Sequence, residues 1–372
     1  MEQLIQDVFE IIQDYRADEG RQIVKVTPER IKLWVNQFEE DDREFILTEL
    51  KSIFQKRYCS KEKAKDFLRQ VIERLATDFK YENKQDFLKN CVFLDLQPNG
   101  KSQKMMLAQL EEHIQEVYGM KLSDCGSNVK KHFIYIDDIL CTGNTLFQDI
   151  KDWAAGLYSE GKTNLQALKN NEIDLIFTYI FTHIKNYRKK NVEFRKKIDP
   201  DVENKHKMYY MHKINNSNDY DSELNFILPL EEGLTDKAIE YKNRIVEEVD
   251  KYTDEKGWGR VEEEFFREAG KPQTEILFSS LENRVRFENI MLSKGIEILS
   301  KASTNLKTMR ALGYSLPSQK NFGFGTLCFT WRNIANNTPL VFWYKGGSFT
   351  PLFEKNQTGT QDFGNFARRV NF

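Results

Sequence analysis

Apolar side chains recur every three or four positions through residues 1–88, and this period predicts a run of helices. Thr27-Pro28-Glu29 predicts the start of one helix, because the hydroxyl can cap free N–H groups and proline suits the first turn. Further helices are expected from about Asp41 and after Ser60. Such apolar stripes are typical of a packed helical bundle rather than of ligand contacts.

Short apolar runs then replace the helical period at three places. Residues 92–96, 133–136 and 173–181 have the apolar, β-prone content of buried strands. Helical patterns separate these runs from one another. The alternation predicts an α/β fold with an open, mostly parallel sheet flanked by helices, and a ligand site at the carboxyl ends of the strands.

Helical and extended patterns are mixed in the last third of the chain. Residues 238–249 and the stretch from about Leu281 have helical apolar spacing. Residues 323–329 predict a strand, and Asn336-Asn337-Thr338-Pro339 has the composition of a turn that leads into a second strand, so a β-hairpin is expected. The chain as a whole is expected to divide into an N-terminal helical region (1–88), an α/β core (89–230) and a C-terminal α+β extension that completes or covers the site (231–372).

A basic and polar stretch, residues 185–218, follows the third predicted strand. It includes Lys189-Lys190, Arg195-Lys196-Lys197 and Lys205-His206-Lys207. We expect a solvated insertion here, because charged runs usually face water. A contact surface for an anionic partner such as RNA or DNA is the alternative, although no aromatic stacking pattern accompanies the charge.

The overall balance of charges argues against a chain built for nucleic-acid binding. The 55 Lys and Arg residues nearly match the 57 Asp and Glu residues, which leaves a net charge of −2. Five cysteines without close pairing, and without His at metal spacing, argue against a structural zinc site and suit a reducing cytoplasm. Neither a signal peptide nor a membrane span is expected, because the N-terminus is quickly polar and no apolar run reaches about 18 residues.

Residues 133–146 carry the most informative pattern in the chain. Phe-Ile-Tyr-Ile runs directly into Asp137 and Asp138, and the loop Cys141-Thr142-Gly143-Asn144-Thr145 then leads into a helical pattern. Loop N–H groups and Thr hydroxyls at a helix N-terminus can bind a phosphate dianion. The two carboxylates can accept hydrogen bonds from vicinal ribose hydroxyls. We interpret the stretch as a phosphate-plus-sugar cradle, and the alternative is a buried strand that ends in a polar turn.

A second loop with phosphate-binding character follows the first predicted strand. It reads Gln97-Pro98-Asn99-Gly100-Lys101-Ser102-Gln103 and precedes a helical pattern. It is not a P-loop, because Asp95 stands where that motif requires glycine. A glycine-bearing loop between strand and helix can still hold a phosphate, which makes Gly100, Lys101 and Ser102 candidates for a second phosphate site. An ordinary solvent-facing turn is the alternative.

The stretch 133–146 resembles the phosphoribosyl-pyrophosphate (PRPP) signature of type I phosphoribosyltransferases. The resemblance implies that Cys141–Thr145 hold a 5′-phosphate and that Asp137 and Asp138 lie at the ribose. It also implies Mg²⁺, which these two carboxylates would hold indirectly through the ribose. PRPP or another nucleotide is the implied ligand.

The resemblance extends to an upstream pyrophosphate loop, for which Gly100–Ser102 is the candidate, with Lys101 as a catalytic residue that stabilises the leaving group. Cys141 departs from the family, since many active members have Asp at this position and others have Thr or Ser. A thiol with an ordinary pKa of about 8.5 is a poor general base. We therefore interpret Cys141 as a packing residue, and phosphoribose binding is better supported than any particular transfer reaction.

Further motifs occur in one order along residues 28–355. They are the helix with Trp34 and Gln37-Phe38, the Gln-Pro-x-Gly-Lys-Ser loop, the Asp-Asp and Thr-Gly-Asn-Thr core, Arg286-Phe287-Glu288, and the terminal Asn-Asn-Thr-Pro-Leu with Phe-Trp. Together they resemble the phosphoribosyltransferase-like conflict effectors of prokaryotes, a branch found in antiphage defence loci that include retron operons. The resemblance implies a toxin held inactive until infection that acts on nucleotides or nucleic acid. It makes Asn337 and Thr338 candidates for the acceptor side of the site.

Two other functions remain open at the level of sequence. A catalytically inactive module that senses a nucleotide or binds a partner would explain Cys141 and the lack of an obvious His or Glu base. An adaptor would use the N-terminal helices and residues 185–218 to dock on a reverse transcriptase with its RNA/DNA hybrid. The superfamily often dimerises, so a homo-oligomer is also compatible with the resemblance.

Overall fold

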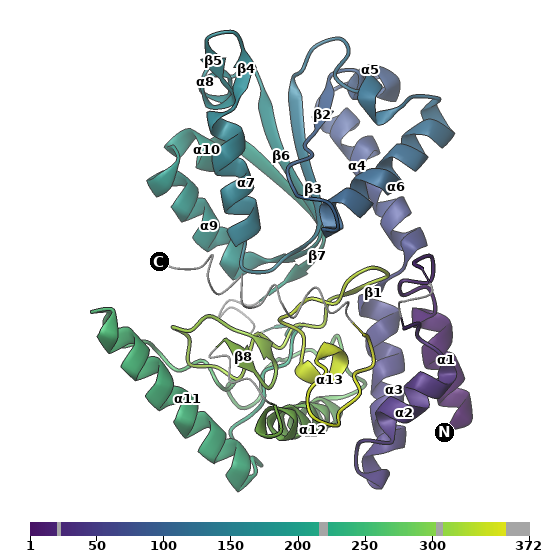
Figure 1. Cartoon of the computed structure of the whole chain (residues 1–372), viewed down its shortest axis with the longest axis vertical. Coiled ribbons are helices and arrows are strands. Elements are labelled where there is room, and N and C mark those ends of the chain that lie inside the picture. Colours follow the sequence, from purple (N-terminus) through teal and green to yellow (C-terminus); the bar gives the residue numbers. More distant parts are fainter. Residues whose placement is uncertain (21–23, 216–221, 303–307, 355–372) are drawn as a thin grey trace. The chain divides into compact units, whose positions relative to one another are not determined.

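The computed structural model describes residues 1–20, 24–215, 222–302 and 308–354. The chain forms two compact units, one of Met1–Ser60 with Asn218–Phe372 and the other of Lys61–Ser217 (Figure 1). This division differs from the three segments expected from the sequence. Residues 61–88 belong to the unit that contains the sheet because α4, Lys61–Asp78, contacts the sheet, and residues 1–60 belong with the C-terminal part of the chain.

A four-stranded parallel sheet forms the centre of the second unit. Its order is β2 (Cys91–Phe93), β3 (His132–Leu140), β6 (Asp174–His183) and β7 (His206–Ile214). Every neighbouring pair is parallel, so the carboxyl ends of all four strands lie at one edge. The α/β expectation with a parallel sheet is confirmed.

Helices cover both faces of this sheet (Figure 1). On one side lie α4, α5 (Lys84–Leu88) and α6 (Ser102–Tyr118). On the other side lie α7 (Asn144–Ala155), α8 (Asn164–Lys169), α9 (Ile184–Lys197) and α10 (Pro200–Lys205). A 3-10 turn, Leu122–Asp124, follows α6, and a small hairpin of β4 (Leu157–Ser159) and β5 (Lys162–Thr163) precedes α8.

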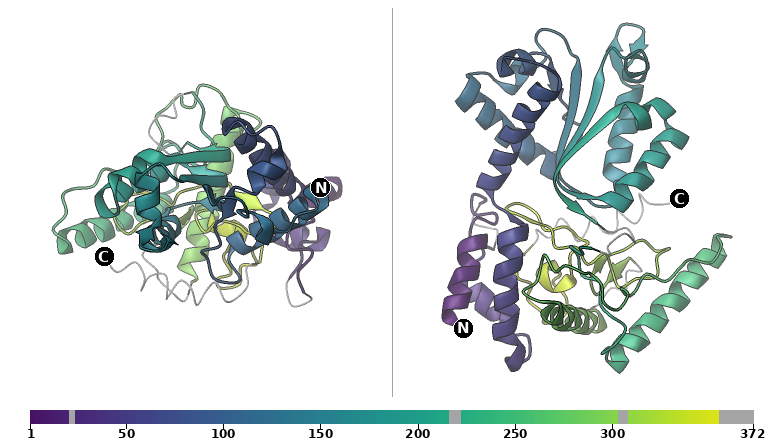
Figure 2. Two further views of the ribbon diagram at one scale, coloured as in Figure 1. Left: turned by 90° about the horizontal axis from the view of Figure 1, so that it is seen from above. Right: turned by 180° about the vertical axis from the view of Figure 1, so that it is seen from behind.

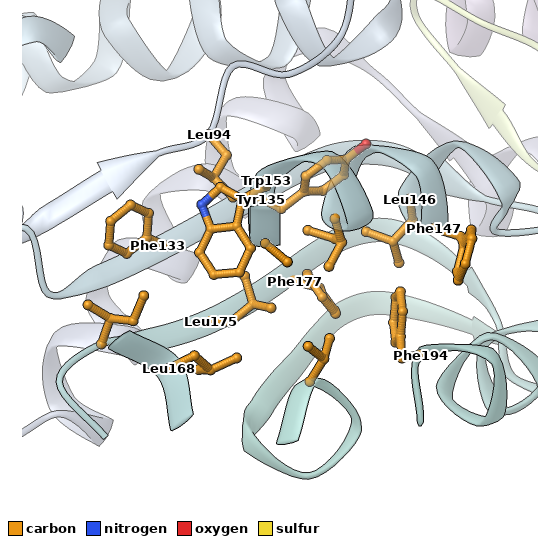
Figure 3. Close-up of a cluster of buried hydrophobic side chains, with 14 of the residues drawn as sticks. Leu94, Phe133, Tyr135, Leu146, Phe147, Trp153, Leu168, Leu175, Phe177 and Phe194 are labelled. Carbon is orange, nitrogen blue, oxygen red and sulfur yellow. The ribbon is translucent and has the colours of Figure 1, made fainter. Parts of the chain in front are cut away.

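An aromatic core fills the space between the sheet and α7 (Figure 3). Phe133 and Tyr135 on β3 and Phe177 on β6 point toward it, because alternate residues of a strand share one face. Phe147 of α7 stacks on Phe194 of α9 with ring centroids 6.0 Å apart. The core fixes α7, and with it the loop at the N-terminus of α7, against the sheet.

The expectation of a solvated insertion at residues 185–218 is wrong for its described part. Residues 184–214 form α9, α10 and the edge strand β7 of the main sheet. Phe194 and Val202 are fully buried and anchor this segment, while Arg195 and its lysine neighbours face outward. An edge strand needs little apolar alternation, since only one of its sides pairs and much of it stays in contact with water.

Helices dominate the first unit. They are α1 (Glu2–Ile12), α2 (Pro28–Val35), α3 (Glu40–Arg57), α11 (Asp236–Glu255), α12 (Leu281–Ser300) and the short α13 (Leu340–Trp343). The first three lie side by side (Figure 2). The predicted start of α2 is confirmed, because Thr27 Oγ1 accepts a hydrogen bond of 3.2 Å from the backbone N–H of Arg30. In the described part of the chain, no helix has both the length and the apolar character that a membrane crossing requires.

The predicted C-terminal hairpin is wrong. The strands of this region are two-residue pieces, β1 (Tyr58–Cys59) with β10 (Phe329–Thr330), and β8 (Met309–Arg310) with β9 (Gly313–Tyr314). The predicted second strand is instead α13. The turn Asn336–Pro339 leads into this helix because the Trp343 Nε1–H group donates to the carbonyl of Thr338 at 2.7 Å and closes the segment on itself.

A buried ion-pair cluster holds α12 against the loop 224–228. Glu288 is fully buried and pairs with both Arg267 and Arg284. Arg284 also pairs with Glu275 and donates to the carbonyls of Leu224 and Phe226. Both guanidiniums of this cluster, those of Arg267 and Arg284, therefore have a carboxylate partner, and the motif that contains Glu288 has a structural place in this unit.

Candidate functional site

The acid pair forms the sixth and seventh of the nine residues of β3, toward the carboxyl edge of the sheet. Asp137 is 7% exposed and Asp138 is 3% exposed. The strand continues past them to Leu140, which pairs with Thr182 of β6. The acids are therefore part of a buried strand end and not of a solvated turn.

The carboxylate of Asp137 accepts three hydrogen bonds from the protein. Ser102 Oγ donates to Oδ1 at 2.6 Å, the backbone N–H of Asp138 donates to Oδ1 at 2.9 Å, and Gln97 Nε2 donates to Oδ2 at 2.8 Å. Burial raises the pKa of Asp137 to about 7, the negative charge of Asp138 adds to this rise, and the three donors oppose it. The structure thus brings the upstream loop and the acid pair, 35 positions apart in the sequence, into direct contact.

A buried polar network continues from Asp137 into α7. Gln97 Nε2 also donates to the hydroxyl of Tyr135 at 2.6 Å, and that hydroxyl donates to Asp149 Oδ2 at 2.7 Å. Burial raises the pKa of Asp149 and holds the pKa of Tyr135 well above its usual value. Reasoning from the sequence missed Gln97, Tyr135 and Asp149. Of the three, only Tyr135 has a signal in the sequence, because its hydroxyl stands among the otherwise apolar residues 133–136.

The upstream loop 97–102 is tied to the sheet through Gln103, the second residue of α6. Gln103 is fully buried, and its Oε1 accepts hydrogen bonds of 2.9 Å from the backbone N–H groups of both Leu96 and Gln97. Its Nε2 lies 3.3 Å from the carbonyl of Ile136. Gly100 adopts a positive φ of 87°, and both Gly100 and Lys101 are exposed just before α6. The candidate residues Gly100–Ser102 therefore lie beside the acid pair, with Ser102 in contact with it.

The loop before α7 is shorter than the sequence predicts, because only residues 141–143 precede the helix and Asn144 and Thr145 form its first turn. Gly143 caps this helix in the left-handed region with φ 74°, and no side chain caps the helix. Thr142 Oγ1 lies 3.5 Å from the backbone nitrogen of Asn144, which is a long contact. The first turn of α7 has no acidic residue. Its N–H groups are thus available to an anion, with no carboxylate of that turn in competition.

Two residues of α9 support this loop from the side. Asn186 Nδ2 donates to the carbonyl of Cys141 at 2.8 Å. The Lys190 side chain lies across Gly143, where an added Cβ would come within 2.6 Å of Lys190 Cγ. Lys190 is buried, pairs with Glu193 at 2.9 Å and has its ammonium 5.7 Å from the ring centroid of Phe147. Sequence reasoning grouped Lys190 with the exposed lysines, because the contact with Gly143 depends on the crossover from β6 to α9.

Asn337 and Thr338 belong to the other unit, where both side chains are buried. The carbonyl of Asn337 accepts hydrogen bonds of 3.1 Å from both the N–H and the hydroxyl of Thr326. These contacts explain the loop as part of the packing of that unit. The assignment of Asn337 and Thr338 to the acceptor side remains a prediction.

The carboxylate oxygens of the acid pair suit Mg²⁺ only if the metal is held mainly by a bound ligand and by waters. No group of three or more His, Cys, Asp or Glu side chains gathers at one point among the residues that the structure describes. Mg²⁺ commonly keeps several waters and uses one or two carboxylates together with substrate phosphates. Asp137 and Asp138 are oxygen donors of this kind, so the residues fit a metal held mainly by the ligand and its waters.

The comparison with known families adds one finding. The sequence model of the PRTase-CE family matches residues 31–355, which is most of the chain. No curated protein and no solved structure matches the chain.

Proposed function

The chain belongs to the PRTase-CE family, and from this membership and the geometry of β3 we propose that it binds the phosphoribosyl group of PRPP or of a related nucleotide. One observation carries the proposal. The acid pair lies on β3, the loop 141–145 follows directly after that strand, and Ser102 of the upstream loop touches Asp137 at 2.6 Å. These are the three parts that a 5′-phosphate, a ribose and a pyrophosphate require.

The 5′-phosphate would bind at the N-terminus of α7. The uncapped N–H groups of its first turn, together with the hydroxyls of Thr142 and Thr145, offer donors for a dianion. Thr145 is exposed, and Thr142 is half-buried. A helix N-terminus carries a partial positive charge, which adds to the attraction for a phosphate.

The ribose would lie at Asp138, and the pyrophosphate toward Lys101 and Ser102. Rupture of the bond between C1′ and the pyrophosphate oxygen leaves positive charge on the ribose and negative charge on the leaving group. Lys101 is exposed at the start of α6, where its ammonium can stabilise that negative charge. Mg²⁺, when bound, would supply further charge stabilisation on the pyrophosphate. A base, water, or a group of a protein or nucleic acid could each serve as acceptor.

Binding without turnover is the second candidate, and the position of Cys141 favours it. Cys141 offers neither a carboxylate nor a hydroxyl beside the phosphate loop, and its carbonyl is engaged by Asn186. Asp137, the other acid near the cradle, is engaged by three donors of the protein. A nucleotide-sensing module would need the cradle and no general base.

The biological role that fits the family resemblance is that of a toxin effector in an antiphage system, including the retron type. Its partner would be a reverse transcriptase with its RNA/DNA hybrid. The exposed basic residues of α9, Lys189 and Arg195–Lys197, offer a surface for the nucleic acid. If Gln substitutions at these positions leave the affinity for such a complex unchanged, that contact is ruled out.

Binding and turnover are separated by two assays on the full chain. Ribose 5-phosphate and PRPP with Mg²⁺ are titrated first, with ribose 1-phosphate as the matched control that lacks the 5′-phosphate. The cradle is supported if ribose 5-phosphate and PRPP bind and ribose 1-phosphate does not. Equal binding of all three ligands contradicts it. Pyrophosphate release from PRPP is then measured with bases, nucleosides, RNA and DNA as acceptors. Release supports an enzyme, whereas binding without release supports the module.

A further inference from the structure

The carboxylate of Asp137 is already occupied by the protein. Its Oδ1 accepts from Ser102 Oγ and from the N–H of Asp138, and its Oδ2 accepts from Gln97 Nε2, all between 2.6 and 2.9 Å. An ionised carboxylate has about four lone-pair sites, so little capacity remains for ribose hydroxyls. We propose that Asp137 is a positioning residue that holds the upstream loop 97–102 against β3, and that Asp138 alone takes the ribose hydroxyls.

The partners of Asp137 come from both ends of the upstream loop. Gln97 lies at its beginning, and Ser102 lies at its end, where α6 starts. A carboxylate that binds both ends fixes the loop as a closed arc. Lys101, the residue proposed to face the pyrophosphate, lies next to Ser102 in this arc and is positioned by the same contact.

The same network reaches the other half of the cradle. Gln97 donates to Tyr135, and Tyr135 donates to Asp149 of α7, the helix whose N-terminus follows the phosphate loop. Buried hydrogen-bonded networks of this kind are rigid, because breaking one bond leaves a polar group without a partner away from water. The network therefore sets the spacing between the pyrophosphate side and the 5′-phosphate side.

Asp138 is placed differently. Successive residues of a strand point to opposite faces, so its side chain leaves β3 on the face away from Asp137. Its Oδ1 accepts from the N–H of Ile139 at 2.7 Å, a contact with its own strand. The Ser102 and Gln97 donors go to Asp137 and not to Asp138. Asp138 can therefore change partners on ligand binding without releasing the loop.

The first test needs no ligand. Asp137→Asn keeps the shape of the side chain, but its new NH₂ group faces the Gln97 or Ser102 donor. Hydrogen exchange of the backbone amides of residues 96–103 is expected to rise by about tenfold or more, since the loss of such a bond costs about 1–3 kcal/mol. Ser102→Ala removes one of the same bonds from the loop side and should give a rise that is not additive with Asp137→Asn. Asp138→Asn is the matched control and should leave these amides unchanged.

The second test rests on the proposed function and measures how much the 2-hydroxyl of the sugar contributes to binding. The dissociation constants of ribose 5-phosphate and 2-deoxyribose 5-phosphate are compared in each variant. Asp137→Asn should weaken the binding of both sugars and leave the ratio of their dissociation constants unchanged. Asp138→Asn should bring this ratio close to one.

The outcomes of the two tests are distinct. The positioning role of Asp137 is overturned if Asp137→Asn brings the ratio of dissociation constants close to one. It is also overturned if hydrogen exchange of residues 96–103 is unchanged in both Asp137→Asn and Ser102→Ala. If the wild type binds neither sugar, the proposed function fails. The exchange experiment then decides the positioning role of Asp137 by itself.

Discussion

Gly143→Ala is the substitution to which the phosphate loop should be most sensitive. Gly143 has φ 74°, a conformation that alanine adopts only with strain. A Cβ at this position would lie 2.6 Å from Lys190 Cγ, far closer than two carbons in contact. The change therefore combines backbone strain with overpacking at one position.

The two contributions can be given magnitudes separately. Left-handed backbone costs an L-residue about 1–2 kcal/mol. Lower entropy of the unfolded chain returns about 0.4–1 kcal/mol, which leaves a net cost of about 1 kcal/mol. Overpacking adds about 1–3 kcal/mol, because Cγ lies near the start of the Lys190 side chain and cannot move without the stem. The expected loss for Gly143→Ala is thus about 2–4 kcal/mol.

Gly161→Ala is the matched control within the same unit. Gly161 has φ 71°, and nothing lies within 4 Å of an added Cβ. It should lose only the net backbone cost of about 1 kcal/mol. The free energy of opening is read from native-state hydrogen exchange of the β3 amides, which reports on the sheet unit without a two-state assumption for the whole chain.

Lys190→Ala completes the test. It removes Cγ and Cδ and leaves Cβ, which lies 3.6 Å from the added methyl group, an ordinary contact. In this background the excess cost of Gly143→Ala over Gly161→Ala should disappear. Equal costs of the two glycine substitutions in the wild type, or an excess that persists without the lysine, would refute the contact.

Three further predictions follow from other parts of the molecule. The pKa of Asp137 is raised by burial to about 7, so the folded state binds the proton more tightly than the unfolded state, and the stability of the wild type falls as pH rises from about 4 to 7. The stability of Asp137→Asn relative to the wild type should therefore rise between pH 5 and pH 8, and a constant difference contradicts this. Glu288→Ala leaves two buried guanidiniums short of a partner and should cost about 3–5 kcal/mol in urea denaturation, whereas Glu297→Ala on the same helix, where the side chain is 45% exposed, should cost less than about 1 kcal/mol; similar losses would count against the buried cluster. Lys101→Met should weaken the binding of PRPP more than the binding of ribose 5-phosphate in calorimetry. An equal effect on both ligands would contradict a contact of Lys101 with the pyrophosphate.

Periodicity predicted the parts of the fold whose apolar pattern is strong. The helices of the first 88 residues and the strands β3 and β6 have buried faces that repeat clearly in the sequence. The edge strand β7 was missed, because its charged and aromatic residues alternate weakly and four of its nine residues are exposed. Residues 323–343 were misread as a hairpin, since β10 in this range pairs with β1 of the N-terminal part and the expected second strand is the helix α13.

The candidate site was predicted where its residues are neighbours in the sequence. Asp137, Asp138 and the loop 141–145 form one continuous strand-loop-helix segment, so local pattern sufficed. The bond from Gln97 to Tyr135 joins residues 38 positions apart, and the contact of Lys190 with Gly143 joins residues 47 positions apart. These contacts depend on the register of the parallel strands and on the crossover helices, neither of which a local pattern specifies.

Calorimetric titration of PRPP with Mg²⁺ into the full chain tests the central claim most directly. Three proteins are compared: the wild type, Asp138→Asn, and Asp152→Asn, a control on the exposed side of α7 in the same unit. The cradle predicts binding by the wild type and the control, with a loss of about tenfold or more in Asp138→Asn, since a hydrogen bond to a charged group contributes about 1.5–3 kcal/mol. A folded wild type that binds no PRPP, or an Asp138→Asn variant that binds as well as the control, would contradict the account.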